Sequence, residues 1–199
     1  MQELVELTPA RQAVVLLPLG IVLLTCAYTD FKERKVFNKV TYPSLFIGLA
    51  VHTIVLGVDG LLAGLLAVAV AFVLGLFLLA LGVIGGGDIK LLIVVGAFLG
   101  LGGLTQTAFY SVFTGAIGGL VASVFNGYLP QMVRNIATYI RNAFRVLLYR
   151  DRNLWVTLER DERGWIPFAI AIFFGGVLAW SDATYDWPGL YAMVLSVWT

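Results

Sequence analysis

Two aspartates, Asp30 and Asp88, are the residues in this sequence best suited to do chemistry. Asp30 comes at the end of the first long apolar segment of the chain, and Asp88 opens a later one. Both are therefore expected at a water–lipid boundary, where water can reach them. An aspartate deep in hydrocarbon would cost roughly 2.5–3.5 kcal/mol on insertion scales. An aspartyl protease in a membrane needs at least two carboxylates held together at one face of a helix bundle.

Such a pair works because its two carboxyl groups differ in protonation. Two like charges about 4 Å apart repel by roughly 4 kcal/mol at an effective dielectric constant near 20. One carboxyl group therefore keeps its proton, and the pair titrates as a unit. The ionised group takes a proton from an attacking water, while the protonated group hydrogen-bonds the scissile carbonyl and then helps the amine to leave. This chemistry requires no metal and no cofactor, and we predict neither.

Three glycines, Gly85, Gly86 and Gly87, precede Asp88. Without β-carbons the backbone can turn sharply and approach an extended substrate closely. The helix that follows carries positive partial charge at its start, which favours an ionised Asp88. Lys90 either adds to this effect or marks the membrane boundary. The alternative is an ordinary loop in which Asp88 caps the next helix.

Other polar residues have simpler interpretations. Asp30 on its own could be a solvated loop residue among basic neighbours. We expect Asn38 to cap the second apolar segment, with a supporting role at the site as the alternative. His52, the one histidine, lies in the outer part of the second apolar segment, away from the face of the two aspartates, so we predict no Ser/His/Asp triad. We expect it to hydrogen-bond a neighbouring helix. Cys26 is the one cysteine, which excludes a disulfide framework and a CxxC metal site.

The composition indicates a membrane protein. Of the 199 residues 60% are hydrophobic, against about 45–50% in soluble domains. Backbone groups in lipid must be satisfied within helices or a closed barrel. The apolar runs are continuous, whereas barrel strands alternate in segments of about 10 residues. The predicted fold class is therefore an all-α, polytopic membrane helix bundle, formed as a single domain over residues 1–199.

Six spans are predicted, because each membrane crossing needs about 17–25 apolar residues. They cover approximately residues 9–28, 40–57, 61–83, 88–102, 106–128 and 165–181, and an interfacial aromatic tail follows at 187–198. Small residues recur at every fourth position in the third span, at Ala63, Ala67, Ala71 and Gly75, which is typical of closely packed helices in lipid.

Lysine and arginine gather in three alternate loops, which the positive-inside rule assigns to the cytoplasm. Both chain termini are then outside, and both aspartates lie at the cytoplasmic face. The longest of these loops, 131–164, is expected to contain a basic amphipathic helix on the inner leaflet, bound to anionic lipid. Contact with a substrate or partner is the alternative for this helix. Nucleic-acid binding has no support, because the basic residues fit membrane orientation.

The segment from Gly85 to Lys90 resembles the GxGD signature of the type IV prepilin peptidases, which are membrane aspartyl proteases. The spacing from Asp30 to Asn38 is similar to the first-aspartate region of that family, although Phe37 stands where proline is usual. The Pro-Phe pair at 167–168 is also similar to one seen in the family. Together these similarities extend over most of the chain.

The resemblance implies Asp30 and Asp88 as the catalytic pair, with Gly85 and Gly87 shaping the site. It implies a multi-pass protein of the inner membrane that cuts the basic leader from prepilins or pseudopilins at the cytoplasmic face. Members that also methylate the new N-terminus carry an extra domain, often with paired CxxC motifs. We therefore expect peptidase activity without methylation, as in the short peptidases of Flp-type pili or secretion systems.

Two other classes of function remain as alternatives. In a small transporter or channel, boundary carboxylates would bind cations, but such a protein would have ionisable groups nearer mid-membrane and along a path. A non-catalytic subunit of a pilus or secretion assembly would need no carboxylate pair at all. Cleavage of a leader-bearing peptide by the purified protein distinguishes both from a peptidase.

Overall fold

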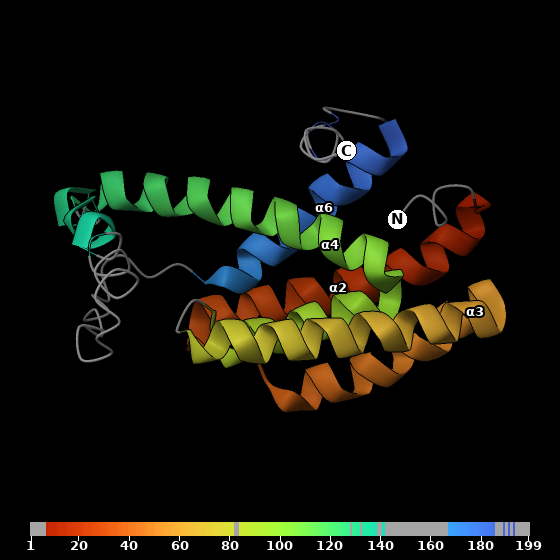
Figure 1. Cartoon of the computed structure of the whole chain (residues 1–199). Coiled ribbons are helices and arrows are strands. Elements are labelled where there is room, and N and C mark those ends of the chain that lie inside the picture. Colours follow the sequence, from red (N-terminus) through yellow and green to blue (C-terminus); the bar gives the residue numbers. More distant parts are fainter. Residues whose placement is uncertain are drawn as a thin grey trace. The chain divides into compact units, whose positions relative to one another are not determined.

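The computed structural model describes residues 7–81, 84–127, 129–131, 133–138, 141, 167–185, 189, 191 and 193. Over these residues the chain is helical and contains no strand. Four helices follow one another along the chain (Figure 1): α2 (Pro9–Glu33), α3 (Asn38–Ala80), α4 (Gly86–Phe125) and α6 (Phe168–Tyr185). All four are long and apolar enough to cross a membrane, by length and composition. The predicted all-α class is therefore confirmed for the described residues.

The chain forms two compact units, one of residues 1–115 and 167–199 and the other of residues 116–166. The second contains the end of α4, a turn with a positive φ of 63° at Gly127, and further helical residues at 129–131, 133–138 and 141. Most of the cytoplasmic loop expected over 131–164 lies outside the described residues. That loop and its amphipathic helix stay predictions, as does the single domain.

In the first unit, α3 reverses direction at Gly57. The backbone there has φ 73° and ψ −154°, which is not helical. Gly64, which follows the bend, lies against Leu49, which precedes it. A β-carbon at Gly64 would lie 3.0 Å from Leu49 Cδ2. In a straight helix these residues would be about 22 Å apart. In Figure 1 the two stretches of α3, orange and yellow, lie side by side and run in opposite directions.

A second bend interrupts α4 at Gly100, where φ is 65° and ψ is −171°. The two bends in α3 and α4 lie near the ends predicted for the second and fourth spans. His52 is buried beside both: a β-carbon at Gly100 would lie 3.1 Å from its Cε1, and one at Gly60 would lie 2.5 Å from its carbonyl oxygen. The bends at Gly57 and Gly100 therefore occur at the same end of the unit, where His52 packs between them.

The first stretch of α4 is the centre of the first unit. Every residue from 94 to 100 is buried. Glycines allow the neighbouring helices to approach it: a β-carbon at Gly48 would lie 2.6 Å from Phe98 Cδ2, and one at Gly75 would lie 2.5 Å from Ile89 Cγ2. The buried small residues of the second stretch of α3 are Gly60, Gly64, Ala67, Ala71 and Gly75. The predicted small-residue face is thus confirmed at Ala67, Ala71 and Gly75. At its first position Ala63 is only half-buried, and the neighbouring Gly64 is buried instead.

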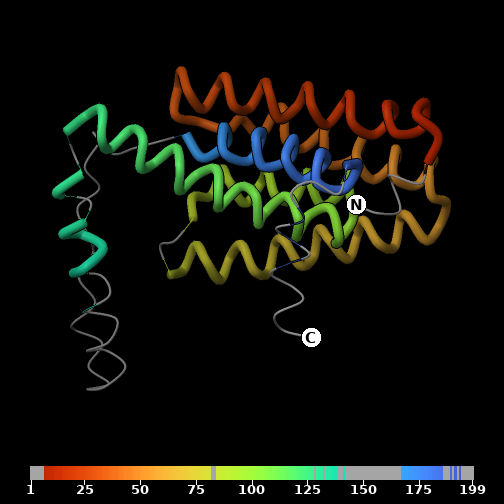
Figure 2. Tube along the Cα trace, turned by 90° about the horizontal axis from the view of Figure 1, so that it is seen from above, coloured from red at the N-terminus to blue at the C-terminus, as the bar shows by residue number. Residues whose placement is uncertain are grey.

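Helix α2 has one apolar face against the unit and another directed outward. Its buried residues include Val15, Leu19 and Leu23, and it packs along α6, as Figure 2 shows from above. The outward face repeats every three or four residues, as expected for one side of a helix, and its members are Val14, Leu17, Ile21, Leu24, Tyr28 and Phe31. An exposed apolar stripe of this length is suited to lipid.

Candidate functional site

Asp30 lies in the last turn of α2 and is buried, with 6% of its surface exposed. Its Oδ2 accepts a hydrogen bond of 3.3 Å from the backbone N–H of Ala169, in the first turn of α6. The helix continues to Glu33, beyond the end predicted near residue 28. It ends where Arg34 adopts a left-handed conformation, with φ 53°, and donates its N–H to the Asp30 carbonyl oxygen at 2.9 Å.

Asp88 lies in the first turn of α4 and is half-buried. The carbonyl oxygen of Gly85 accepts the first intrahelical bond, from the N–H of Ile89 at 3.3 Å, which makes Gly85 the N-cap residue. The N–H of Gly85 in turn donates to Asp88 Oδ2 at 3.1 Å. Asp88 is therefore the third residue of the helix and reaches back to the cap, as in a capping box. The N-cap position considered for Asp88 is wrong.

The glycines before Asp88 differ in their surroundings. Gly86 is exposed, and a β-carbon there would meet no other atom within 4 Å. A β-carbon at Gly87 would lie 3.2 Å from Cγ2 and 3.3 Å from Cβ of Val36. Val36 belongs to the short connection between α2 and α3. The glycine at position 87 therefore lets this connection approach the start of α4 closely.

These contacts gather four helix ends at one place. The 34–37 connection joins the end of α2 to the start of α3, Val36 touches the start of α4, and Asp30 touches the start of α6. Asp30 and Asp88 thus lie at the same end of the first unit. The starts of α3, α4 and α6 all contribute positive partial charge there. The arrangement can hold two carboxyl groups at one end of the unit, each with a backbone N–H as hydrogen-bond donor.

Two further predicted residues flank this place. Asn38 is exposed and is the first residue of α3, and the N-cap is Phe37, whose carbonyl oxygen accepts from the N–H of Thr41 at 3.2 Å. The predicted cap at Asn38 is therefore wrong, because the extended backbone that precedes the helix ends at Phe37 (φ −80°, ψ 131°). Lys90 is half-buried, two residues beyond Asp88.

Sequence reasoning missed the two contacts that assemble the site. One contact is made by a backbone N–H, that of Ala169, and the other by the apolar side chain of Val36. Neither alanine nor valine is a residue type that suggests a functional role. The proline at 167 was one available signal, since it directly precedes the first turn of α6. Among the described residues, no group of three or more His, Cys, Asp or Glu side chains lies together in a way that could hold a metal ion.

Comparison with known proteins gives an independent result. The model of the type IV leader peptidase family matches residues 17–120, which include both aspartates. A prepilin leader peptidase/N-methyltransferase of Bacillus subtilis (strain 168) is 36% identical over 128 residues, covering 63% of this chain and 48% of that protein. The chain thus spans about half the length of this relative. No solved structure is significantly similar. Because the family match covers more than half of its length, the chain belongs to the type IV leader peptidase family, a family of membrane proteases.

Proposed function

We propose that this protein is a membrane aspartyl endopeptidase that removes the basic leader peptide of type IV prepilins or pseudopilins. Asp30 and Asp88 are the catalytic pair in this proposal. Gly85, Gly86 and Gly87 shape the site, and Gly86, where a β-carbon would meet nothing within 4 Å, leaves room for the substrate backbone. The observation that carries it is the meeting of four helix ends where the two carboxylates lie. The family membership supplies the reaction class.

The reaction needs one ionised and one protonated carboxyl group. The ionised group accepts a proton from water as the water oxygen attacks the scissile carbonyl carbon. The protonated group donates a hydrogen bond to the carbonyl oxygen, on which negative charge develops. When the tetrahedral intermediate collapses, the C–N bond breaks and the amine leaves with a proton from the carboxyl pair. The two products are the free leader and a mature protein with a new amino terminus.

The proposed topology is six crossings with both termini outside and the active site facing the cytoplasm. The bends at Gly57 and Gly100 support it, because each divides a long apolar helix into two stretches. Asn38 and Gly57 are separated by about 28 Å of helix, close to the roughly 30 Å of a hydrocarbon core. Basic residues at the end that holds the aspartates also agree with a cytoplasmic location, namely Lys32, Arg34, Lys35, Lys39 and Lys90.

For the 199-residue chain we propose peptidase activity without transfer of a methyl group, and Flp-like prepilins as substrates. The relative of Bacillus subtilis is named for both activities, but the alignment extends over 48% of its length. The one cysteine of the chain, Cys26, is buried in the core and offers no paired thiols. Incubation with S-adenosylmethionine and a cleaved prepilin tests this: no methyl group should appear on the new amino terminus.

The proposal is tested with purified protein and a leader-bearing prepilin. Asp30→Asn and Asp88→Asn should each reduce cleavage by at least about 10²–10⁴-fold, the contribution typical of a general acid or base. Asparagine keeps the size of the side chain and a hydrogen-bond acceptor, so the variants should insert and unfold like the parent. Asp59→Asn is the matched control, because Asp59 is exposed beside the Gly57 bend. Full-speed cleavage by either site variant would refute the catalytic pair.

A further inference from the structure

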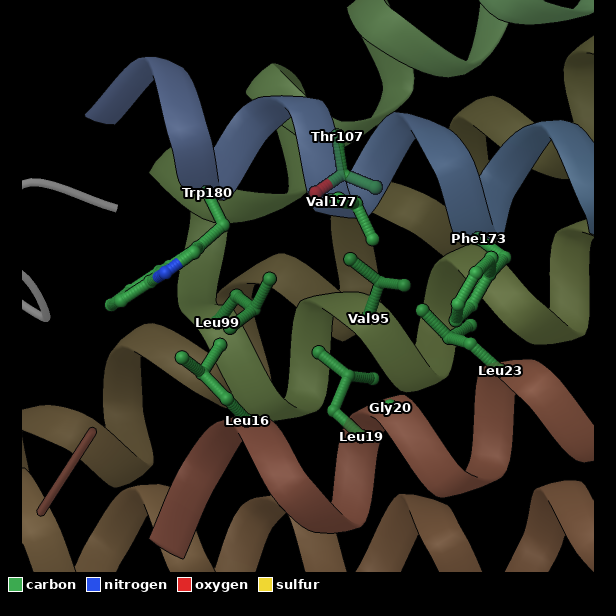
Figure 3. Close-up of a pocket in the computed structure, with 11 residues that line it drawn as sticks. Leu16, Leu19, Gly20, Leu23, Val95, Leu99, Thr107, Phe173, Val177 and Trp180 are labelled. Carbon is green, nitrogen blue, oxygen red and sulfur yellow. The ribbon is translucent and has the colours of Figure 1, made fainter. Parts of the chain in front are cut away.

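An apolar pocket of about 170 Å³ lies between α2, α4 and α6 in the first unit. Figure 3 shows Leu19 and Leu23 of α2 facing Phe173 and Val177 of α6, with Val95 and Leu99 of α4 between them. Apart from Thr107, the side chains that line it are apolar. Val177 is 51% exposed, so the pocket opens onto the outer surface of the helices, which faces lipid in a membrane.

Two glycines keep the pocket open. A β-carbon at Gly20 of α2 would meet no other atom within 4 Å, and one at Gly176 of α6 would lie 3.7 Å from Leu23 and 3.8 Å from Thr107. The neighbouring Gly175 is different, because a β-carbon there would lie 2.3 Å from Ser111 Oγ. Gly175 thus allows helices to pack together, whereas Gly20 and Gly176 leave space unfilled. A β-carbon at either position fits without backbone movement.

The size of the pocket limits what can enter it. An apolar cavity of about 150 Å³ holds one benzene molecule. A pocket of about 170 Å³ therefore admits one large side chain or a short length of acyl chain, but not the body of a helix. Its carbon-lined wall favours an occupant without charge.

The pocket and the candidate site lie along the same pair of helices, α2 and α6. Along α2, Leu23 precedes Asp30 by seven residues, or about 10 Å of helix. Along α6, Phe173 follows Ala169, the hydrogen-bond donor to Asp30, by four residues, or about 6 Å. The packed interface between these two helices therefore runs from the Asp30 carboxylate toward the pocket.

We propose that the substrate carries an apolar, membrane-embedded segment after the cleaved bond, and that this pocket receives one bulky apolar side chain from it. This inference rests on the proposed function. A substrate segment that leaves Asp30 along this interface enters lipid between α2 and α6 and meets the pocket there. Because the pocket extends from Leu16 to Leu23, a helical segment would place this side chain about 7–14 residues beyond the cut.

The test compares two substrates and pocket-filling variants. One substrate is a full-length precursor in detergent or vesicles, and the other is a short peptide that ends a few residues after the cut. Gly20→Phe and Gly176→Leu should lower kcat/KM for the precursor by roughly 10- to 100-fold, the effect of losing one buried large side chain. They should leave cleavage of the short peptide unchanged. Leu17→Phe, on the exposed face of α2, should change neither.

Each outcome separates this inference from the proposed function. Unchanged cleavage of the precursor by both pocket variants would overturn the inference and leave lipid as the occupant. An equal loss on both substrates would overturn it as well, because the substitutions would then act on the catalytic site. If the parent protein cut neither substrate, the proposed function itself would fail. Photocrosslinking supplies a second measurement: benzoylphenylalanine in place of Val177 should capture the precursor, and in place of Leu17 it should not.

Discussion

At the scale of single residues, the contact of Gly87 with Val36 holds two parts of the candidate site together. Gly87→Ala would place a β-carbon 3.2 Å from Val36 Cγ2, so the Val36 side chain must shift by a few tenths of an ångström. We expect a loss of about 1–3 kcal/mol in the free energy of unfolding, as for other overpacked positions. Val36→Ala in the same chain should restore most of it, which a double-mutant cycle of unfolding in detergent measures.

Gly86→Ala is the matched control for that cycle. A β-carbon at Gly86 meets nothing within 4 Å, and the residue is the first of α4. Its unfolding free energy should stay unchanged or rise slightly, because alanine restricts the unfolded chain more than glycine. If Gly86→Ala and Gly87→Ala lowered the unfolding free energy equally, the requirement for glycine at these positions would come from backbone freedom and not from the contact with Val36.

The sequence singled out Asp30 and Asp88 because residue type and position beside an apolar run are local properties. It could not predict that the Ala169 N–H donates to Asp30, since that contact joins residues 139 positions apart and depends on how α2 and α6 pack. The cap at Asn38 was wrong by one residue for a similar reason. Side-chain preference favours asparagine at a cap, but the path of the 34–37 connection makes Phe37 the last extended residue.

At the scale of helices, the bends at Gly57 and Gly100 depend on backbone angles that only glycine adopts readily. Alanine at either position should cost about 1–3 kcal/mol of stability. Gly100→Ala should cost more than Gly57→Ala, because its β-carbon would also lie 3.1 Å from His52 Cε1, whereas the one at Gly57 meets nothing. Thermal unfolding of both variants in detergent checks the order. The reverse order would mean that His52 moves away at little cost.

Hydropathy predicted these bends well and the helix ends poorly. Uninterrupted apolar runs of 40 residues or so are too long for one crossing, so breaks near residues 57 and 102 could be expected from the sequence. The end of α2 at Glu33 could not, because hydropathy reports where lipid ends and not where hydrogen bonding ends. Polar residues such as Asp30 and Lys32 continue a helix beyond the apolar core without penalty, until Arg34 turns the chain.

At the scale of the whole molecule, the distribution of charge and the positions of the bends lead to the same proposed orientation. Glu33 and Asp59 can be used to test this orientation, one for each side of the membrane. Both are exposed, and they lie near opposite ends of the first stretch of α3. Cys26 is fully buried, and Cys26→Ala removes the one native thiol. Single cysteines can then be introduced at positions 33 and 59 in this background.

The six-crossing topology predicts opposite behaviour for these two cysteines toward a membrane-impermeant maleimide. Asp59→Cys should react in intact cells, because the Gly57 bend lies on the outer side in this proposal. Glu33→Cys should react only after the membrane is opened, because it lies three residues from Asp30 on the cytoplasmic side. If the two cysteines reacted from the same side, the chain between them would not cross the membrane, and six crossings would be ruled out. If both reacted from reversed sides, the site would face outward, and a leader cut in the cytoplasm could not reach it.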